Sequence, residues 1–442
     1  MLTIPGRAHN LCDGISRRDA LRVGSLAVGG VTLAGLLERK AVAARRGEVI
    51  PDTAVIQIFC GGGPSHIDMY DLKPNAPAEV RGEFQEISTS VSGLRISEQL
   101  PLQAAVMDRF AIVRSVAHHS SAHDIASQMI LTGNVPPRVT KDNLFPSCGS
   151  VVAKVRGANR GGLPSYVAVP RQVSFGKAAY LGSAFNPFTT DSNPSDAGFQ
   201  VQNLKLTAGM EGDRLSYRRD LLSGLDKLRR DIDLSGDLSG LDSFSRHALE
   251  MITSEKAARA FDIESEEPAV RDRYGRTFIG QNCLLARRLV EAGVSYVTCL
   301  SGGGWDTHRD NFALLKNESL PRYDRAIAAL VNDIYERGLD KNVLVMAFGE
   351  FGRTPRINKD AGRDHWPGAM SVLISGGGLK VGQMVGETDS KAAFPISKPY
   401  TPACVLATMY RVMGIDHHRH FPDHSDRPIA ILADGQHIPE LL

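Results

Sequence analysis

The chain has 442 residues, of which 42% are hydrophobic and 23% charged, a composition typical of a soluble globular protein with a sizeable core. This composition excludes a chain that is disordered as a whole. The 51 lysines and arginines nearly balance 49 acidic residues, so the net charge is only +2. No basic surface for nucleic acid or an anionic membrane follows from such a balance, and binding to DNA or RNA is not expected.

Residues 1–44 are typical of a twin-arginine export signal. Arg17 and Arg18 precede an uncharged run at 23–37, and small residues follow up to Ala44. The uncharged run is shorter than the roughly 20 residues that a membrane-spanning helix needs. We expect cleavage near Ala44, a mature chain without a stable membrane span, and a periplasmic or extracellular location. An uncleaved anchor is the alternative.

Residues 45–442 alternate between short β-branched segments and longer helical patterns, without an internal repeat. Strands are predicted at 54–60, 110–116, 165–169, 294–300, 343–348 and 371–375. Helices are predicted at 146–155, 214–232, 244–261, 278–292, 321–337 and 402–412, and a further helical stretch ends at 131–133. This alternation predicts one α/β domain whose mostly parallel sheet carries helices on both faces.

A loop-rich and helical excursion around 180–242 interrupts this pattern, with Asn-Pro and Ser-Gly sequences along it. It is predicted to be an insertion in the α/β domain. Two roles fit equally well, a cap over the functional site and a peripheral helical hairpin.

Acidic and imidazole side chains follow the predicted strands at their carboxyl ends. Glycine triplets precede the first two sets, at 61–63 and 302–304, and let the backbone turn sharply. Ligands of open α/β sheets bind at the carboxyl ends of strands, so these side chains are expected to converge. The candidate metal ligands are Asp68, Asp306, His308, Glu350, Asp364 and His365.

The predicted cofactor is a divalent metal ion. Carboxylates combined with neutral imidazoles suit zinc, manganese or iron, whereas carboxylate-rich subsets suit magnesium or calcium. The glycine-rich stretch at 61–68 has neither dinucleotide-binding nor P-loop spacing. It also lacks the closing glycine of a nucleophile elbow, which disfavours a serine-triad hydrolase.

A second cluster, at 118–124, contains three histidines and two serines between a predicted strand and a predicted helix. Backbone N–H groups at a helix start bind anions, so the cluster could bind a substrate anion, supply a nucleophile or add a metal ligand. Alternatively, Ser120 or Ser121 caps the helix and the histidines are exposed. The histidine-rich tail at 417–424 is interpreted as an exposed loop.

In combination, these motifs resemble the uncharacterised DUF1501 family, which is similar to a branch of the alkaline phosphatase and sulfatase superfamily. The matching stretches are 62–68 with 71–74, 304–308, 349–355 and 362–366. The resemblance implies an alkaline phosphatase-like α/β fold with metals held by carboxylates and histidines. The matching positions are Asp68 for the early Asp, Asp306 and His308 for a middle pair, Glu350 for a late carboxylate and His365 for the final His.

Three features depart from the superfamily pattern. The middle pair has the short spacing Asp-x-His, and Phe351 stands where a histidine of the late pair is expected. Counting back from the Leu-Thr-Gly at 131–133 puts His123 at the nucleophile position, and using Ser120 or Ser121 requires a shifted register. The resemblance therefore leaves two mechanisms, a phosphohistidine at His123 and direct attack by metal-activated water.

The leading functional hypothesis is an exported, metal-dependent hydrolase of a phosphate or sulfate ester on a small molecule or polysaccharide. In it, His123, Ser120 and Ser121 are catalytic candidates, and Arg353 and His119 bind the substrate anion. Pairing of Arg353 with Glu350 is the structural alternative for that arginine. The competing hypothesis is a non-catalytic, metal-holding envelope protein that binds a polysaccharide or a partner.

Overall fold

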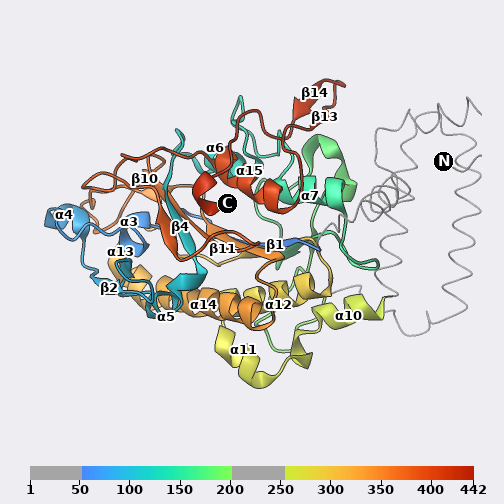
Figure 1. Cartoon of the computed structure of the whole chain (residues 1–442), viewed down its shortest axis with the longest axis horizontal. Helices are drawn as coiled ribbons and strands as arrows, with labels where there is room; N and C mark the ends of the chain where they lie inside the picture. The colour runs from blue at the N-terminus through green and yellow to red at the C-terminus, as the bar shows by residue number, and fades with distance from the viewer. Residues whose placement is uncertain (1–51, 202–253) are drawn as a thin grey trace, which may run out of the picture. The chain divides into compact units, whose positions relative to one another are not determined.

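The computed structural model describes residues 52–201 and 254–442 (Figure 1). The predicted export signal at 1–44 and the helix predicted at 214–232 lie outside the described residues. Most of the inserted segment predicted at 180–242 lies outside them too. The helix predicted at 244–261 is described only in its second half, where helix α10 spans Glu255–Phe261.

An eight-stranded sheet forms the centre of the domain, in the order β12-β4-β11-β8-β1-β7-β5-β6. Its strands are β1 (Ala54–Phe59), β4 (Ala111–Val116), β5 (Tyr166–Val169), β6 (Phe188–Thr189), β7 (Tyr296–Leu300), β8 (Val343–Phe348), β11 (Met370–Gly376) and β12 (Gln383–Val385). Strand β11 runs antiparallel to both of its neighbours, and the other neighbouring strands are parallel. The predicted α/β class with a mostly parallel sheet is confirmed.

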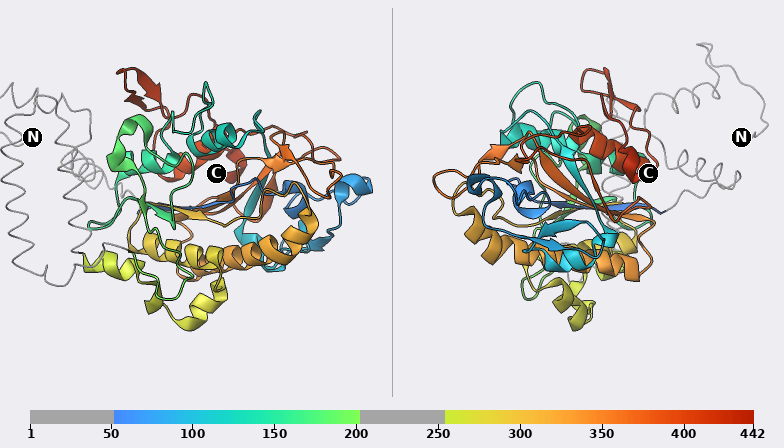
Figure 2. Two further views of the ribbon diagram at one scale, coloured as in Figure 1. Left: turned by 180° about the vertical axis from the view of Figure 1, so that it is seen from behind. Right: turned by 60° about the vertical axis from the view of Figure 1, so that its left-hand side comes forward.

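Helices cover both faces of this sheet (Figures 1 and 2). Helices α6 (His123–Thr132), α7 (Cys148–Arg156) and α15 (Pro402–Val412) pack on one face, and α12 (Phe278–Ala292) and α14 (Leu320–Glu336) pack on the other. Side chains of β1 alternate between two cores, with Ile56 and Ile58 on the α12–α14 side and Val55 and Phe59 on the α6–α15 side. All six residues of β1 are buried because the strand lies inside a doubly covered sheet.

The remaining helices are short: α3 (His66–Met69), α4 (Ala78–Arg81), α5 (Pro101–Ala105), α11 (Pro268–Tyr274) and α13 (Asn311–Leu314). Within residues 52–201 and 254–442, three strand pairs lie outside the sheet, β2 (Glu86–Ser88) with β3 (Arg95–Ser97), β9 (Gly352–Arg353) with β10 (His365–Trp366), and β13 (His420–Pro422) with β14 (Pro428–Ala430). No helix in the described part of the chain has the length and apolarity needed to cross a membrane.

Strand register aligns the ends of the three central strands. Phe59, the last residue of β1, lies opposite Leu300 at the end of β7 and opposite Phe348 at the end of β8. The turns that follow these strands therefore begin at the same edge of the sheet. This alignment sets the position of the candidate site.

Buried Asp324 on α14 joins that helix to α5. Its carboxylate accepts hydrogen bonds from the backbone N–H groups of Leu102, at 2.9 Å, and Gln103, at 2.8 Å. These contacts satisfy donors at the start of α5 that have no partner within the helix. Burial nevertheless raises the pKa of Asp324 to about 6, against the opposing effect of these hydrogen bonds.

We expect Asp324→Asn to change how stability depends on pH. The native state holds this proton up to a higher pH than the unfolded state, so the contribution of Asp324 is largest below pH 4 and is lost as the pH rises through 6. Urea unfolding at pH 4 and pH 7 should show that the stability difference between wild type and variant shifts by about 2 kcal/mol in favour of the variant. Exposed Asp360→Asn is the control, and equal shifts for both variants would contradict the assignment.

Candidate metal centre

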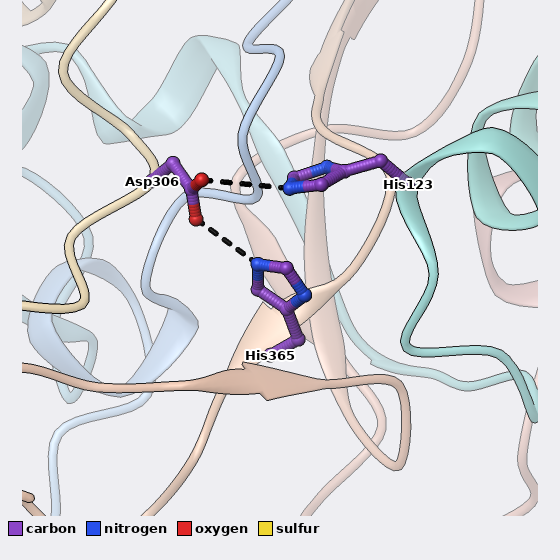
Figure 3. A group of neighbouring side chains, drawn as sticks. All are labelled: His123, Asp306 and His365. Atoms are coloured by element: carbon purple, nitrogen blue, oxygen red, sulfur yellow. Dashed lines mark hydrogen bonds and ion pairs between the residues drawn. The ribbon is translucent and has the colours of Figure 1, made fainter.

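Three side chains from separate parts of the sequence converge at the carboxyl edge of the sheet (Figure 3). Asp306 follows β7, His123 is the first residue of α6, and His365 lies on β10. One potential ligand atom from each lies within 4.8 Å of the others. Both imidazole rings direct a nitrogen toward the Asp306 carboxylate, each toward a different oxygen (Figure 3).

His308 extends this group to four side chains. Its Nε2 lies 3.1 Å from Oδ1 of Asp306 and 2.9 Å from Nε2 of His365. The same Oδ1 of Asp306 is 3.0 Å from Nε2 of His365, and its Oδ2 is 3.5 Å from Nε2 of His123. One nitrogen of each of the three imidazoles thus lies within 3.5 Å of the Asp306 carboxylate. This donor set suits zinc or manganese.

The glycines that follow β1 let the turn pass close to the segment carrying Asp306. Gly62 has φ 116°, a backbone conformation that other residues rarely adopt, and a Cβ there would lie 2.8 Å from the backbone N of Asp306. Gly63 also has a positive φ, and a Cβ on it would collide with the ring of Phe351. Gly62 and Gly63 are therefore required for close packing of the turns around the site.

Glu350 lies behind His123. Its buried carboxylate accepts hydrogen bonds from the backbone N–H of Gly62, at 2.9 and 3.1 Å, and lies 2.5 Å from Nδ1 of His123. This hydrogen bond raises the pKa of His123, against the opposing effect of partial burial. An Nδ1–H bound to Glu350 leaves Nε2 of the neutral ring as the free electron-pair donor.

The other two imidazoles are oriented in the same way. Nδ1 of His308 lies 2.6 Å from Oδ1 of Asp364, and Nδ1 of His365 lies 2.8 Å from the carbonyl oxygen of Ser121. In each ring, Nδ1 is thus bound to an oxygen atom of the protein and Nε2 is directed toward Asp306. Outer partners of this kind fix the tautomer and orientation of histidine ligands in metal sites.

Arg353 is fully buried and its guanidinium is surrounded by acceptors. Nε donates to the carbonyl of Gly63 at 2.9 Å, Nη1 donates to the carbonyl of Arg363 at 3.0 Å, and Nη2 donates to the carbonyl of Gly62 and to Oδ1 of Asp306. Burial would raise the pKa of Asp306, but Arg353 and the neighbouring histidines hold that pKa well below its usual value. We therefore revise the assignment of Arg353 from anion binding to positioning of Asp306, because no exposed surface remains for an anion. Its ion-pair partner is Asp306 rather than Glu350.

Asp68 is buried and makes a bidentate ion pair with Arg363. Nε and Nη2 of Arg363 donate to its two carboxylate oxygens at 2.8 and 2.9 Å. Ser65 Oγ and Asn311 Nδ2 donate to Oδ2, at 2.6 and 2.9 Å. None of these hydrogen bonds joins Asp68 to Asp306 or to the three imidazoles. Arg363 lies inside the matched stretch 362–366, but no role was predicted for it from the sequence.

The serines and histidines that precede α6 have different surroundings. Ser120 is buried, and its Oγ accepts a hydrogen bond from the backbone N–H of Ala122 at 3.3 Å. Ser121 and His119 are exposed. His118, which had no predicted role of its own, lies 2.7 Å through Nε2 from the carbonyl oxygen of Glu350 and ties this loop to the turn after β8.

The N-terminus of α6 opens beside the four ligand candidates. Its N-cap residue, Ala122, has no side chain able to accept a hydrogen bond, and His123 is the first helical residue. The first N–H groups of a helix have no partner within it and attract anions. An anion bound there would lie next to the group formed by His123 and Asp306.

The fold and these side chains define an α/β protein with a candidate metal centre of three histidines and one aspartate at the carboxyl ends of its strands. Residues 52–442 match the model of the family described as "Protein of unknown function (DUF1501)", and the chain belongs to that family. The family predicted from the sequence motifs is thus confirmed. No curated protein matches the chain.

Several solved structures are similar to this chain at low identity. The PsFucS1 sulfatase from Pseudoalteromonas sp. is 12% identical, with a TM-score of 0.38 over 85% of this chain and 70% of that one. Alkaline phosphatase from the Antarctic bacterium TAB5 is 12% identical, with a TM-score of 0.36 over 82% of this chain and 98% of that one. The lipoteichoic acid synthase LtaP from Listeria monocytogenes is 10% identical, with a TM-score of 0.33 over 87% of this chain and 76% of that one. At these values the similarity assigns no function to this chain.

Proposed function

We propose that this protein is a metal-dependent hydrolase of phosphate or sulfate esters. One observation carries the proposal: His123, a candidate ligand, is also the first residue of a helix, so the N-terminal N–H groups of that helix begin beside the same site. A tetrahedral anion bound by these N–H groups would have its reacting atom beside the ligand group. A purely structural ion would not require such an anion site next to it.

The proposed metal ligands are His123, Asp306, His308 and His365. Their donor atoms, three imidazole nitrogens and a carboxylate oxygen, fit a divalent ion such as zinc or manganese. When bound, the ion supplies Lewis acidity at the ester oxygen and lowers the pKa of water. Glu350 and Asp364, which the sequence predicted as ligands, are proposed to orient His123 and His308 instead.

Water is the proposed nucleophile rather than a side chain. Nδ1 of His123 is bound to Glu350 and its Nε2 is a proposed metal ligand, so with the ion bound this ring has no nitrogen free to attack an ester. The hydroxyl of Ser120 is buried and already bound to the backbone of Ala122. Exposed Ser121 remains the candidate for a hydroxyl contact with substrate, together with exposed His119 for the anion.

Export is part of the proposal. The twin-arginine pattern before residue 44 supports transport out of the cytoplasm in a folded state, with action in the periplasm or outside the cell. Substrates in these compartments include phosphate or sulfate esters on small molecules and on polysaccharides. The test is immunodetection of the wild-type chain and of an Arg17→Lys/Arg18→Lys variant in fractionated cells, where the variant should stay in the cytoplasm.

The enzymatic proposal is tested with purified full-length protein and two chromogenic substrates, an aryl phosphate and an aryl sulfate. Chelator treatment should abolish hydrolysis of one of them, and zinc or manganese should restore it. His365→Ala should lower kcat/KM by on the order of 1000-fold, because ligand loss removes several kcal/mol of transition-state stabilisation. His420→Ala, which changes an exposed histidine on β13, is the matched control and should leave the rate unchanged.

The alternative is a metal-holding envelope protein without enzymatic activity. The absence of a hydroxyl or thiol at position 123 favours it, since covalent ester hydrolysis usually begins at such a group. Bound metal without turnover of either ester class, and without any response to His365→Ala, would support this alternative and contradict the hydrolase.

A further inference from the structure

We infer that this site holds one metal ion per chain, and that the buried guanidinium groups of Arg353 and Arg363 take the place of a second cation. The inference shares with the proposed function only the requirement for a bound ion. It concerns the number of ions and the identity of the ligands, which turnover does not determine.

Asp68 is the carboxylate that the motif order assigns to a metal. Four donors already occupy its two oxygens, two of them from the guanidinium of Arg363 and the others from Ser65 and Asn311. Oδ2 accepts three of these hydrogen bonds and Oδ1 accepts one, from the guanidinium of Arg363. A metal ion would therefore have to compete with Arg363 for this carboxylate.

Release of Asp68 to a metal would break a buried ion pair. Neither side chain of the Asp68–Arg363 pair has any exposed surface. Arg363 also donates to the backbone carbonyls of Val80, Thr354 and Pro355, so it is bound on every side. Transfer of Asp68 to a metal would leave this arginine buried without its counter-charge, which is strongly unfavourable.

Asp306 is likewise paired with a buried arginine. Its Oδ1 already receives a hydrogen bond from the buried guanidinium of Arg353 and faces His308 and His365, while Oδ2 faces His123. A carboxylate that bridges two metal ions uses both oxygens for metals. Here Oδ1 already binds the buried guanidinium of Arg353, so Asp306 does not offer both oxygens to metal ions alone. We therefore expect a single metal ion among the imidazoles.

The charge balance leads to the same result. The connected network contains four carboxylates and two guanidinium groups, which leaves a formal charge of −2 when the imidazoles are neutral. One divalent ion neutralises this charge. A second would leave the partly buried site with an excess of two positive charges, and such an excess is costly where solvent is limited. The carboxylates are Asp68, Asp306, Glu350 and Asp364.

Metal stoichiometry tests the inference directly. Full-length protein is stripped with a chelator, titrated separately with Zn²⁺ and Mn²⁺ by calorimetry, and analysed for bound metal by mass spectrometry. We expect saturation at one ion per chain. Binding of two ions per chain overturns the inference, and binding of none overturns both it and the proposed function. One bound ion without ester turnover supports the inference while contradicting the hydrolase.

Variants identify the ligands independently. Asp68→Asn should keep one ion with an affinity within about 3-fold of wild type, while its melting temperature falls by about 5 °C because a buried ion pair is broken. The double variant Asp68→Asn/Arg363→Gln, which replaces the pair with neutral amides, should likewise bind one ion if the single variant does not fold. Loss of an ion from either variant would show that Asp68 is a ligand and overturn the inference. Wild-type stoichiometry remains decisive even if neither variant folds.

Discussion

Asp306→Ala should remove metal binding and ester hydrolysis together while the protein remains folded. Asp306 lies within 3.5 Å of all three imidazole nitrogens of the group, and its two oxygens face different histidines. Its removal takes away the single carboxylate among the four proposed ligands, so affinity for Zn²⁺ should fall by at least about 100-fold. We expect kcat/KM to fall by on the order of 1000-fold, since the charge stabilisation supplied by the ion is lost with it.

Calorimetric titration and a melting curve check this expectation. The side chain of Asp306 is nearly half exposed and Arg353 keeps its three carbonyl acceptors in the variant, so the protein should stay folded. Because buried Arg353 loses its counter-charge, we expect the melting temperature to fall by about 5 °C. Asp360→Ala removes an exposed carboxylate from a neighbouring loop and should leave both metal affinity and rate unchanged. Undiminished affinity in Asp306→Ala would rule out the proposed ligand set.

Arg353→Met should give the largest loss of stability among the residues near the site. The substitution leaves the buried carbonyls of Gly62, Gly63 and Arg363 without their donor, and each unsatisfied acceptor costs about 1 kcal/mol. We expect the free energy of unfolding to fall by about 3 kcal/mol, measured by urea denaturation at neutral pH. Exposed Arg356→Met, three residues away, should change it by less than about 0.5 kcal/mol.

This variant also separates the two roles considered for Arg353. A positioning residue affects stability and metal affinity, because the turn after β1 and the Asp306 carboxylate both lose their support. A residue that contacts the substrate anion affects mainly KM. A raised KM with unchanged stability would therefore return Arg353 to anion binding and contradict the positioning role.

The sheet and its main helices follow from the apolar pattern of the sequence. Strand β8 and helices α12 and α15 have the predicted bounds, because continuous apolar runs and helical periodicity report burial directly. Strands β6 and β12 were not predicted. They lie at the two edges of the sheet, are two and three residues long, and carry mostly half-buried side chains, so no periodic signal distinguishes them from loops.

The sequence by itself determined the family, the α/β class and the carboxyl edge of the sheet as the place for polar residues, because glycine turns and strand ends are local features. The tertiary structure decided which of the candidate ligands face one another. Asp68 and Asp306 look alike as acids beside glycine triplets, yet one is neutralised by Arg363 and the other faces three imidazoles. Such pairing joins residues far apart in the chain. The partner of a buried carboxylate is therefore set by tertiary packing and not by the residues next to it in the sequence.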